Sequence, residues 1–212
     1  ADNLKATFKF PYENTGSANA LRVEKLSVGY GHPLLAPVTF SMTMGEKLLF
    51  TGFNGVGKST LIKSILKKIP ALGGTATFSP SAKVNYFDQD LEWDDPSLTP
   101  LQMIQNMFPT MQPKTIRQKL ARAGINAANT MKPLHLLSGG DQTKVKLAIL
   151  ELTPSNFLIM DEPTNHLDDE TKEGLKTALQ NFPGNLILVS HEQSFYEGWL
   201  DKILNVEKLS LK

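Results

Sequence analysis

Apolar and polar residues alternate at several points of the chain, a pattern that is typical of strands with one buried face. Near the N-terminus, Leu21 and Val23 are followed, after a break, by Leu26 and Val28. This spacing predicts a half-buried strand with an interruption. Short apolar runs between turn-forming residues predict further strands. These strands are expected at residues 48–51, 75–78, 83–87, 157–160 and 186–190.

Other apolar residues recur every three or four positions, which predicts helices between the strands. Leu61, Ile62, Ile65 and Leu66 share one such face, and Pro70 follows them. Helices are expected at residues 59–68, 140–152 and 170–181. Because strands that alternate with helices are joined by crossovers, the sequence predicts an α/β fold with a mostly parallel sheet.

Residues 91–137 have a different character and predict a helical insert. Thr99 and Pro100 can form the cap and first turn of one helix, and a second helix should stop near Gly124. Three methionines lie at helical spacing in this region: Met103, Met107 and Met111. Core packing explains methionines at this spacing better than a cofactor site does.

The composition indicates a globular chain, because 41% of its 212 residues are hydrophobic and 20% are charged. The formal net charge of +1 gives no sign of nucleic-acid binding by this chain alone. The lack of cysteine excludes a disulfide framework and a cysteine-based zinc site, and it fits a reducing cytoplasm. No apolar run approaches the roughly 20 residues that span a bilayer. The chain begins at Ala1 without a signal-peptide pattern, and we interpret it as a piece of a longer protein.

Residues 52–59, which read GFNGVGKS, fit the P-loop pattern and lie between a predicted strand and a predicted helix. Glycines let backbone N–H groups close around phosphate oxygens, and the helix N-terminus adds its positive dipole end. Lys58 would reach the β- and γ-phosphates, and the Ser59 hydroxyl would bind Mg²⁺. The alternative is a glycine-rich turn without function. The candidate nucleotide-binding residues here are Gly52, Asn54, Gly55, Gly57, Lys58, Ser59 and Thr60.

Two acidic residues follow the apolar run at residues 157–160. The carboxyl end of a strand is where α/β sheets place their ligands. Asp161 is therefore a candidate Mg²⁺ carboxylate, and Glu162 is placed to accept a proton from an attacking water molecule. The alternative is a strand that ends in solvated acids.

A second anion site is predicted at residues 137–142, which read LSGGDQ and precede a helix. Ser138 can cap that helix, and Gly139 and Gly140 would expose backbone N–H groups at its N-terminus. An ordinary capped helix would also explain this segment. One chain with one P-loop has no evident need for two phosphate sites.

These three motifs together resemble ABC ATPases, and the resemblance covers nearly all of residues 21–211. It implies an ABC-type P-loop fold with a RecA-like sheet, an N-terminal antiparallel β portion and an inserted helical subdomain. It also implies that two such domains dimerise head to tail, each LSGGDQ-type segment closing on the other's ATP. The resemblance assigns nucleotide-binding or catalytic positions to Tyr30, Gln89, Asp168 and His191, with Gln89 also near Mg²⁺. Core packing for Tyr30, a surface position for Gln89 and a structural role for His191 are the alternatives.

Residues 163–168 read PTNHLD, which is similar to the ABC-F branch rather than to most transporter domains. That branch comprises cytoplasmic translation factors and ribosome-protecting antibiotic-resistance proteins that carry two ATPase domains and contact tRNA on the ribosome. The resemblance implies the end of an interdomain linker at 1–20, an ATP-binding core at 21–90 and 138–212, and a helical subdomain at 91–137. Asp141 departs from the Gln or Glu of most ABC proteins. The alternative is the ATP-hydrolysing motor subunit of a membrane transporter.

Overall fold

The structure is a computed structural model that describes residues 5–14, 18–53 and 57–211. The chain divides into two compact units. The helical unit consists of Ala1–Pro11, Phe87–Pro154 and Pro163–Phe182. The sheet unit consists of Tyr12–Tyr86, Ser155–Glu162 and Pro183–Lys212. The expected division of the chain into an ATP-binding core and a helical subdomain, with boundaries at residues 90 and 138, stays a prediction.

A three-stranded antiparallel sheet begins the sheet unit. Its central strand β1 (Asn19–Ser27) pairs with β2 (Val38–Thr43) on one side and with β4 (Gly73–Phe78) on the other. The pairing of β1 with β2 shifts register between Val23 and Leu26, and Lys25 there has a φ of +44°. The predicted interruption of this strand and the expected antiparallel portion are both confirmed.

The second sheet of this unit is parallel in its central pairings. Its strand order is β5-β6-β7-β3-β8. Strand β7 pairs in parallel with β3 on one side and with β6 on the other, and β8 also pairs in parallel with β3. The strands are β3 (Lys47–Thr51), β5 (Val84–Phe87), β6 (Phe157–Asp161), β7 (Asn185–Val189) and β8 (Lys202–Asn205). Every residue of β6 and β7 is buried, which explains the apolar runs at 157–160 and 186–189. The predicted mostly parallel sheet is confirmed.

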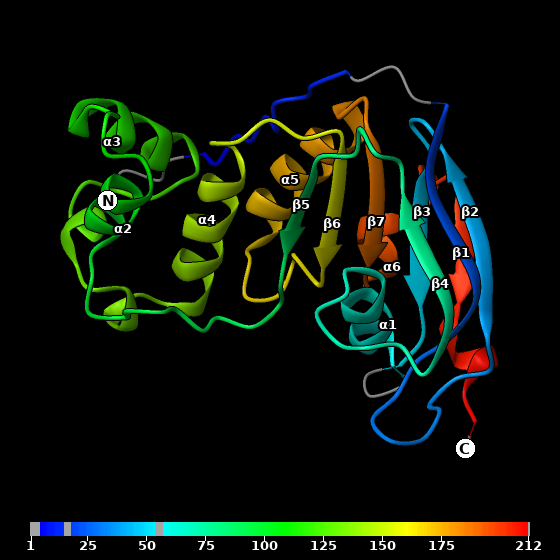
Figure 1. Ribbon diagram of the computed structural model, residues 1–212. Helices are drawn as coiled ribbons and strands as arrows, with labels where there is room; N and C mark the ends of the chain where they lie inside the picture. The colour runs from blue at the N-terminus through cyan, green and yellow to red at the C-terminus, as the bar shows by residue number, and fades with distance from the viewer. Residues whose placement is uncertain (1–4, 15–17, 54–56, 212) are drawn as a thin grey trace. The chain divides into compact units, whose positions relative to one another are not determined.

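The strand order places three strand ends beside one another. Figure 1 shows that the arrowheads of β3, β7 and β6 lie at the same edge of the sheet. Strands β3 and β6 are both neighbours of β7, although β3 is far from them in the sequence. The chain segments that follow these strands therefore begin close together.

Helix α1 (Lys58–Ile65) follows β3 and packs its apolar face into the core of the sheet unit. Leu61, Ile62 and Ile65 are at most 1% exposed, in one cluster with Phe50. The helix ends three residues before the predicted end at residue 68, because Lys67 takes a left-handed conformation with a φ of +60°. A left-handed residue just past the last turn is a common way for a helix to stop. Short elements that the apolar pattern did not predict complete this unit: α6 (Gln193–Tyr196), η3 (Val206–Leu209) and the strand β8.

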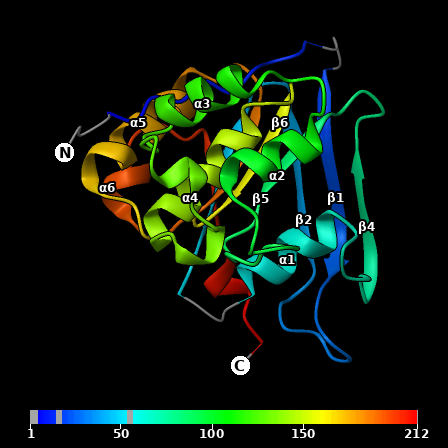
Figure 2. The ribbon, with the colours of Figure 1, turned by 90° about the vertical axis from the view of Figure 1, so that its left-hand side faces the viewer.

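The helical unit contains helices α2 to α5, and Figure 2 shows α2, α3 and α4 with their labels. Their bounds are α2 (Pro100–Met107), α3 (Pro113–Arg122), η1 (Asn129–Met131), η2 (Leu134–Leu136), α4 (Gly139–Leu150) and α5 (Asp169–Asn181). Thr99 caps α2 in a capping box with Gln102, so the predicted cap is confirmed. The prediction of core packing is wrong for Met107, whose side chain is 51% exposed at the last turn of α2.

Residues 5–11, which lie within the predicted linker, include side chains that pack into the helical unit. Ala6, Phe8 and Phe10 are buried, and the rings of the two phenylalanines stack at 6.4 Å. The backbone N–H of Thr7 donates a hydrogen bond of 2.7 Å to the carbonyl oxygen of Arg122. A linker role for residues 1–20 stays a prediction.

Candidate functional site

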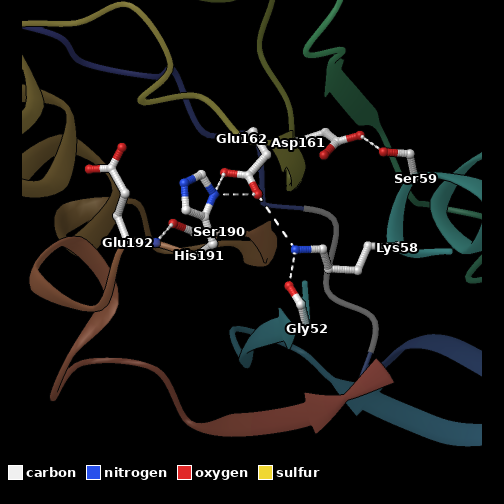
Figure 3. A network of polar contacts seen from close by, with 8 residues as sticks. All are labelled: Gly52, Lys58, Ser59, Asp161, Glu162, Ser190, His191 and Glu192. Carbon is white, nitrogen blue, oxygen red and sulfur yellow. Dashed lines mark hydrogen bonds and ion pairs between the residues drawn. The ribbon is translucent and has the colours of Figure 1, made fainter. Parts of the chain in front are cut away.

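The candidate site lies at the shared edge where β3, β6 and β7 end. Lys58 follows β3, Asp161 and Glu162 stand at the end of β6, and His191 follows β7. Figure 3 shows these side chains converging, although Lys58 lies more than 100 residues before the other three in the sequence. All of them belong to the sheet unit.

Lys58 is the first residue of α1 and is only 5% exposed. Its ammonium group donates a hydrogen bond to the carbonyl oxygen of Gly52 and lies 3.6 Å from Oε1 of Glu162. Burial of a charged group is unfavourable unless the charge is paired and hydrogen-bonded, and these two contacts satisfy that condition. The ammonium group is thus held at the strand edge beside the start of a helix.

The backbone around Lys58 fits an anion. Gly57, at the N-cap of α1, has a φ of +111°, which favours glycine, and no described side chain caps this helix. The first-turn N–H groups of α1 are therefore without a side-chain acceptor in the described part of the chain, and a phosphate group is the kind of acceptor that they suit. Asn54 and Gly55, which the sequence places in the same loop, lie outside the described residues. Thr60 follows in the first turn of α1.

Ser59 and Asp161 form the second feature of the site. The Ser59 hydroxyl donates a hydrogen bond of 2.8 Å to Oδ2 of Asp161, which is fully buried. Among the described residues no group of three or more His, Asp or Glu side chains could hold a metal ion. One hydroxyl and one carboxylate fit Mg²⁺, which typically binds through one or two protein ligands together with phosphates and water.

Glu162 is held in a conformation that non-glycine residues rarely adopt. Its φ is +49°, and its N–H donates a hydrogen bond of 2.9 Å to the carbonyl oxygen of Val189 at the end of β7. Its carboxylate oxygens lie 3.0 and 3.1 Å from Nδ1 of His191, and the side chain is 4% exposed. Backbone strain of this kind is concentrated at functional sites, where it aims a side chain. The carboxylate is thereby placed between His191 and Lys58 and can accept a proton there.

The segment Ser138-Gly139-Gly140 lies in the helical unit, at the start of α4. Ser138 is the N-cap, and its hydroxyl accepts a hydrogen bond of 3.1 Å from the backbone N–H of Asp141. A Cβ atom added at Gly140 would lie 2.6 Å from the carbonyl oxygen of His166, and one at Gly139 would lie 3.0 Å from its ring. Both glycines therefore have a packing reason to be glycine, whatever they bind.

Asp168, a predicted nucleotide-binding residue, caps α5 in the same unit. It accepts a hydrogen bond of 2.7 Å from the backbone N–H of Thr171. The hydrogen bonds from Thr171 hold the pKa of the Asp168 carboxyl below its usual value. The structure shows this capping role directly, and contact with a nucleotide stays a prediction.

Tyr30 and Gln89 are not among the side chains drawn in Figure 3. The ring of Tyr30 is 62% exposed, so core packing does not explain this residue. Gln89 is exposed just after β5, in the helical unit. Both side chains are accessible, and their roles stay predictions.

Sequence reasoning missed Lys146 of α4, which binds the backbone on both sides of Gln89. It also missed the contact of His166 with the glycines of α4. The available signal for Lys146 was a lysine in an otherwise apolar stretch of α4. No local pattern predicts the position of His166 beside the glycines, because that position depends on how two separate segments pack.

Comparison with known proteins places this geometry in a family. The model of the family described as ABC transporter matches residues 35–165. The Bacillus subtilis protein YdiF, named as ATP-binding, is 36% identical over 97% of this chain and 32% of its own length. Human ATP-binding cassette sub-family F member 3 is 36% identical over 77% of this chain and 23% of its own length. The chain thus spans about a third or less of these two relatives.

A solved structure shares the fold. An ATP-binding protein of an ABC transporter from Pyrococcus furiosus superposes with a TM-score of 0.71, at 24% identity, over 90% of this chain and 98% of that one. At this level of identity the likeness establishes the fold alone. Within the described residues, no helix combines the length and apolar character needed to cross a bilayer.

Proposed function

Because this chain belongs to the ABC transporter family and is an ATP-binding ABC ATPase domain, we propose that it hydrolyses ATP at a composite site. One face of that site is the phosphate and Mg²⁺ site of the sheet unit, and the other is the Ser138 segment of a second ABC domain. The observation that carries the proposal is the convergence of Lys58, Glu162 and His191, beside the Ser59–Asp161 pair, at one strand edge (Figure 3).

Each side chain has a role in this proposal. Lys58 and the N–H groups at the start of α1 bind the β- and γ-phosphates of ATP. Ser59 and Asp161 would hold Mg²⁺, which would supply positive charge to offset the negative charge of the phosphates. Glu162 accepts a proton from the attacking water molecule. The water oxygen forms a bond to the γ-phosphorus, the bond from that phosphorus to the β-phosphate oxygen breaks, and ADP leaves. In its imidazolium form His191 can donate from both ring nitrogens, from Nδ1 to the Glu162 carboxylate and from Nε2 to the γ-phosphate.

The second domain is tested by mixing two defective chains. Lys58→Ala removes the phosphate contact, and Ser138→Arg blocks the segment offered to the partner. Homodimers of either variant carry two defective sites, whereas a mixed dimer carries one intact composite site. Mixing should restore activity to at most about half of the wild-type value if the sites are independent.

The matched control is Lys58→Ala mixed with itself at the same total concentration, which should stay inactive. We also expect specific activity of the wild-type chain to rise with protein concentration, because the active species is a dimer. Activity per chain that stays constant at dilutions where only monomer exists would contradict the two-domain site.

For the whole protein we propose an ABC-F role, in which ATP binding and hydrolysis switch two paired domains on the ribosome beside tRNA. Two observations support it: the Asn165-His166 pair after Thr164, and the similarity to ATP-binding cassette sub-family F member 3. This role would place the protein in the cytoplasm, acting in translation or in antibiotic resistance. The partner domain would then be a second ABC domain of the same polypeptide.

A transporter motor is the second candidate, and the name of one relative favours it. The Bacillus subtilis protein YfmM, called an ABC transporter ATP-binding protein, is 34% identical over 96% of this chain. The two candidates differ in what the full-length protein carrying Glu162→Gln binds in the presence of ATP. Co-sedimentation with ribosomes that Lys58→Ala abolishes would support the ABC-F role, and recovery in membranes with a membrane-spanning partner would support the transporter.

A further inference from the structure

The backbone on either side of Gln89 is held by one side chain of helix α4. The ammonium group of Lys146 donates hydrogen bonds to the carbonyl oxygens of Asp88, at 2.6 Å, and of Asp90, at 2.5 Å. It also lies 5.0 Å from the centre of the Phe87 ring. Gln89 therefore projects from a backbone that is fixed at both neighbouring residues, while its own side chain is exposed.

Lys146 is committed to this position by its surroundings. Burial lowers the pKa of its ammonium group, and the nearby charges of Asp88 and Asp90 oppose that shift. A partly buried cation is unfavourable unless its N–H groups find acceptors. The two carbonyl oxygens provide these acceptors. This contact should therefore stabilise the fold more than the ion pair of an exposed lysine would.

A second side chain of α4, that of Gln142, lies four residues before Lys146 and binds Trp93, which follows Asp90 in the chain. The indole N–H of Trp93 donates a hydrogen bond of 2.8 Å to Oε1 of Gln142. Nε2 of Gln142 in turn donates a hydrogen bond of 3.1 Å to the carbonyl oxygen of Leu137, the residue before Ser138. Residues four apart on a helix lie on one face, so Gln142 and Lys146 hold the segment together.

We propose that Lys146 and Gln142 form a latch that fixes Gln89 to helix α4, so that Gln89 and the Ser138 segment change position together. Lys146 and Gln142 are positioning residues in this proposal, and Gln89 is the residue that meets the nucleotide. The inference rests on the proposed function only for that last role. The latch itself consists of contacts within the helical unit.

The latch gives the domain a physical route between its own nucleotide and its partner's. Residues 88–90 and the start of α4 can shift only as one piece while both contacts hold. Contact between Gln89 and ATP bound in the same chain would then bias where Ser138 is presented to the second domain. Breaking the latch should leave ATP binding intact and uncouple it from hydrolysis.

The first test is structural and needs no ATP. In a Trp199→Phe background, Trp93 is the single tryptophan of the chain. Lys146→Met keeps the apolar stem and removes the donors, and we expect acrylamide quenching of Trp93 to rise about two-fold as the segment loosens. Lys146→Arg should restore most of the protection. The control is Lys114→Met, which changes an exposed lysine of α3 and should leave quenching unchanged.

The second test separates binding from turnover. For Lys146→Met we expect an ATP Kd within about 2-fold of wild type and a kcat lower by about 3- to 30-fold, with rescue by Lys146→Arg. The same substitution in a Gln89→Ala background should lower kcat by less than about 2-fold, because the latch acts through Gln89. Circular dichroism melting checks that every variant is folded.

The outcomes distinguish the latch from the function on which it rests. If Gln89→Ala keeps wild-type kcat, the proposed role of Gln89 fails, and the latch is judged by Trp93 quenching alone. Wild-type quenching and wild-type kcat in Lys146→Met would overturn the latch. Fully additive losses in the double variant would also overturn it, because Lys146 would then act independently of Gln89.

Discussion

Replacing Glu162 by glutamine tests both its proposed role as general base and its ion pair with Lys58. The substitution keeps the shape of the side chain and removes its charge. Glu162 lies 3.6 Å from the Lys58 ammonium group and 3.0 Å from Nδ1 of His191, and Lys58 and Glu162 are both buried. An amide can still form a hydrogen bond with His191, so we expect the variant to fold.

The magnitude for ATP binding follows from the geometry. At 3.6 Å and an effective dielectric constant of about 20, two unit charges attract by about 4–5 kcal/mol. The cost of removing both charges from water offsets most of this attraction, which leaves about 1–2 kcal/mol. The phosphates of ATP compete with the Glu162 carboxylate for the Lys58 ammonium group, and the negative charge of Glu162 also repels them. Glu162→Gln should therefore bind ATP about 5- to 30-fold more tightly than wild type.

The same substitution should abolish most turnover. Removal of a general base typically lowers the rate by about 10²- to 10⁴-fold, so the ATP-filled dimer should accumulate. Titration with a fluorescent ATP analogue measures the affinity, single-turnover hydrolysis measures the rate, and size exclusion detects the dimer. The matched control is Glu197→Gln, at an exposed residue just past α6, which should change none of the three. Turnover within about 3-fold of wild type would refute the base assignment, and ATP affinity that stays unchanged would refute competition for Lys58.

Three further predictions concern other parts of the chain. Tyr30→Ala should weaken ATP and GTP binding alike by about 5- to 150-fold, because stacking on a base contributes about 1–3 kcal/mol; equal affinity in Tyr30→Ala and wild type would exclude stacking. Burial raises the pKa of Glu151 to about 7 from 4.5, so the folded state binds its proton more tightly and stability should fall as pH rises between these values. Glu151→Gln should flatten this dependence by about 1–2 kcal/mol after allowance for solvent screening, as measured by urea unfolding at several pH values. Gly140→Ala should cost about 1–3 kcal/mol in thermal unfolding because its Cβ would meet the His166 carbonyl, whereas Gly73→Ala, with room for a Cβ, should cost less.

Local patterns in the sequence predicted most elements of the fold, because they depend on a few neighbouring residues. The apolar run at residues 157–160 became β6 (Phe157–Asp161), and the run at 186–190 became β7 (Asn185–Val189). The motif at 52–59 correctly marked the connection from a strand to a helix, and Lys58 is the first residue of that helix. The four-residue strand β8 (Lys202–Asn205) escaped notice, since a run so short and half exposed has no periodicity to detect.

The sequence by itself determined the candidate residues for binding phosphate, holding Mg²⁺ and accepting a proton, because side-chain chemistry and motif spacing are local properties. Only the tertiary structure decided which of them meet. The position of β7 between β3 and β6 brings His191 to Glu162 and Glu162 to Lys58, and no spacing along the chain encodes that order. The left-handed backbone of Glu162 likewise depends on its hydrogen bond to β7. Strand order and backbone strain arise from packing among distant segments, which is why they appear only when the chain is folded.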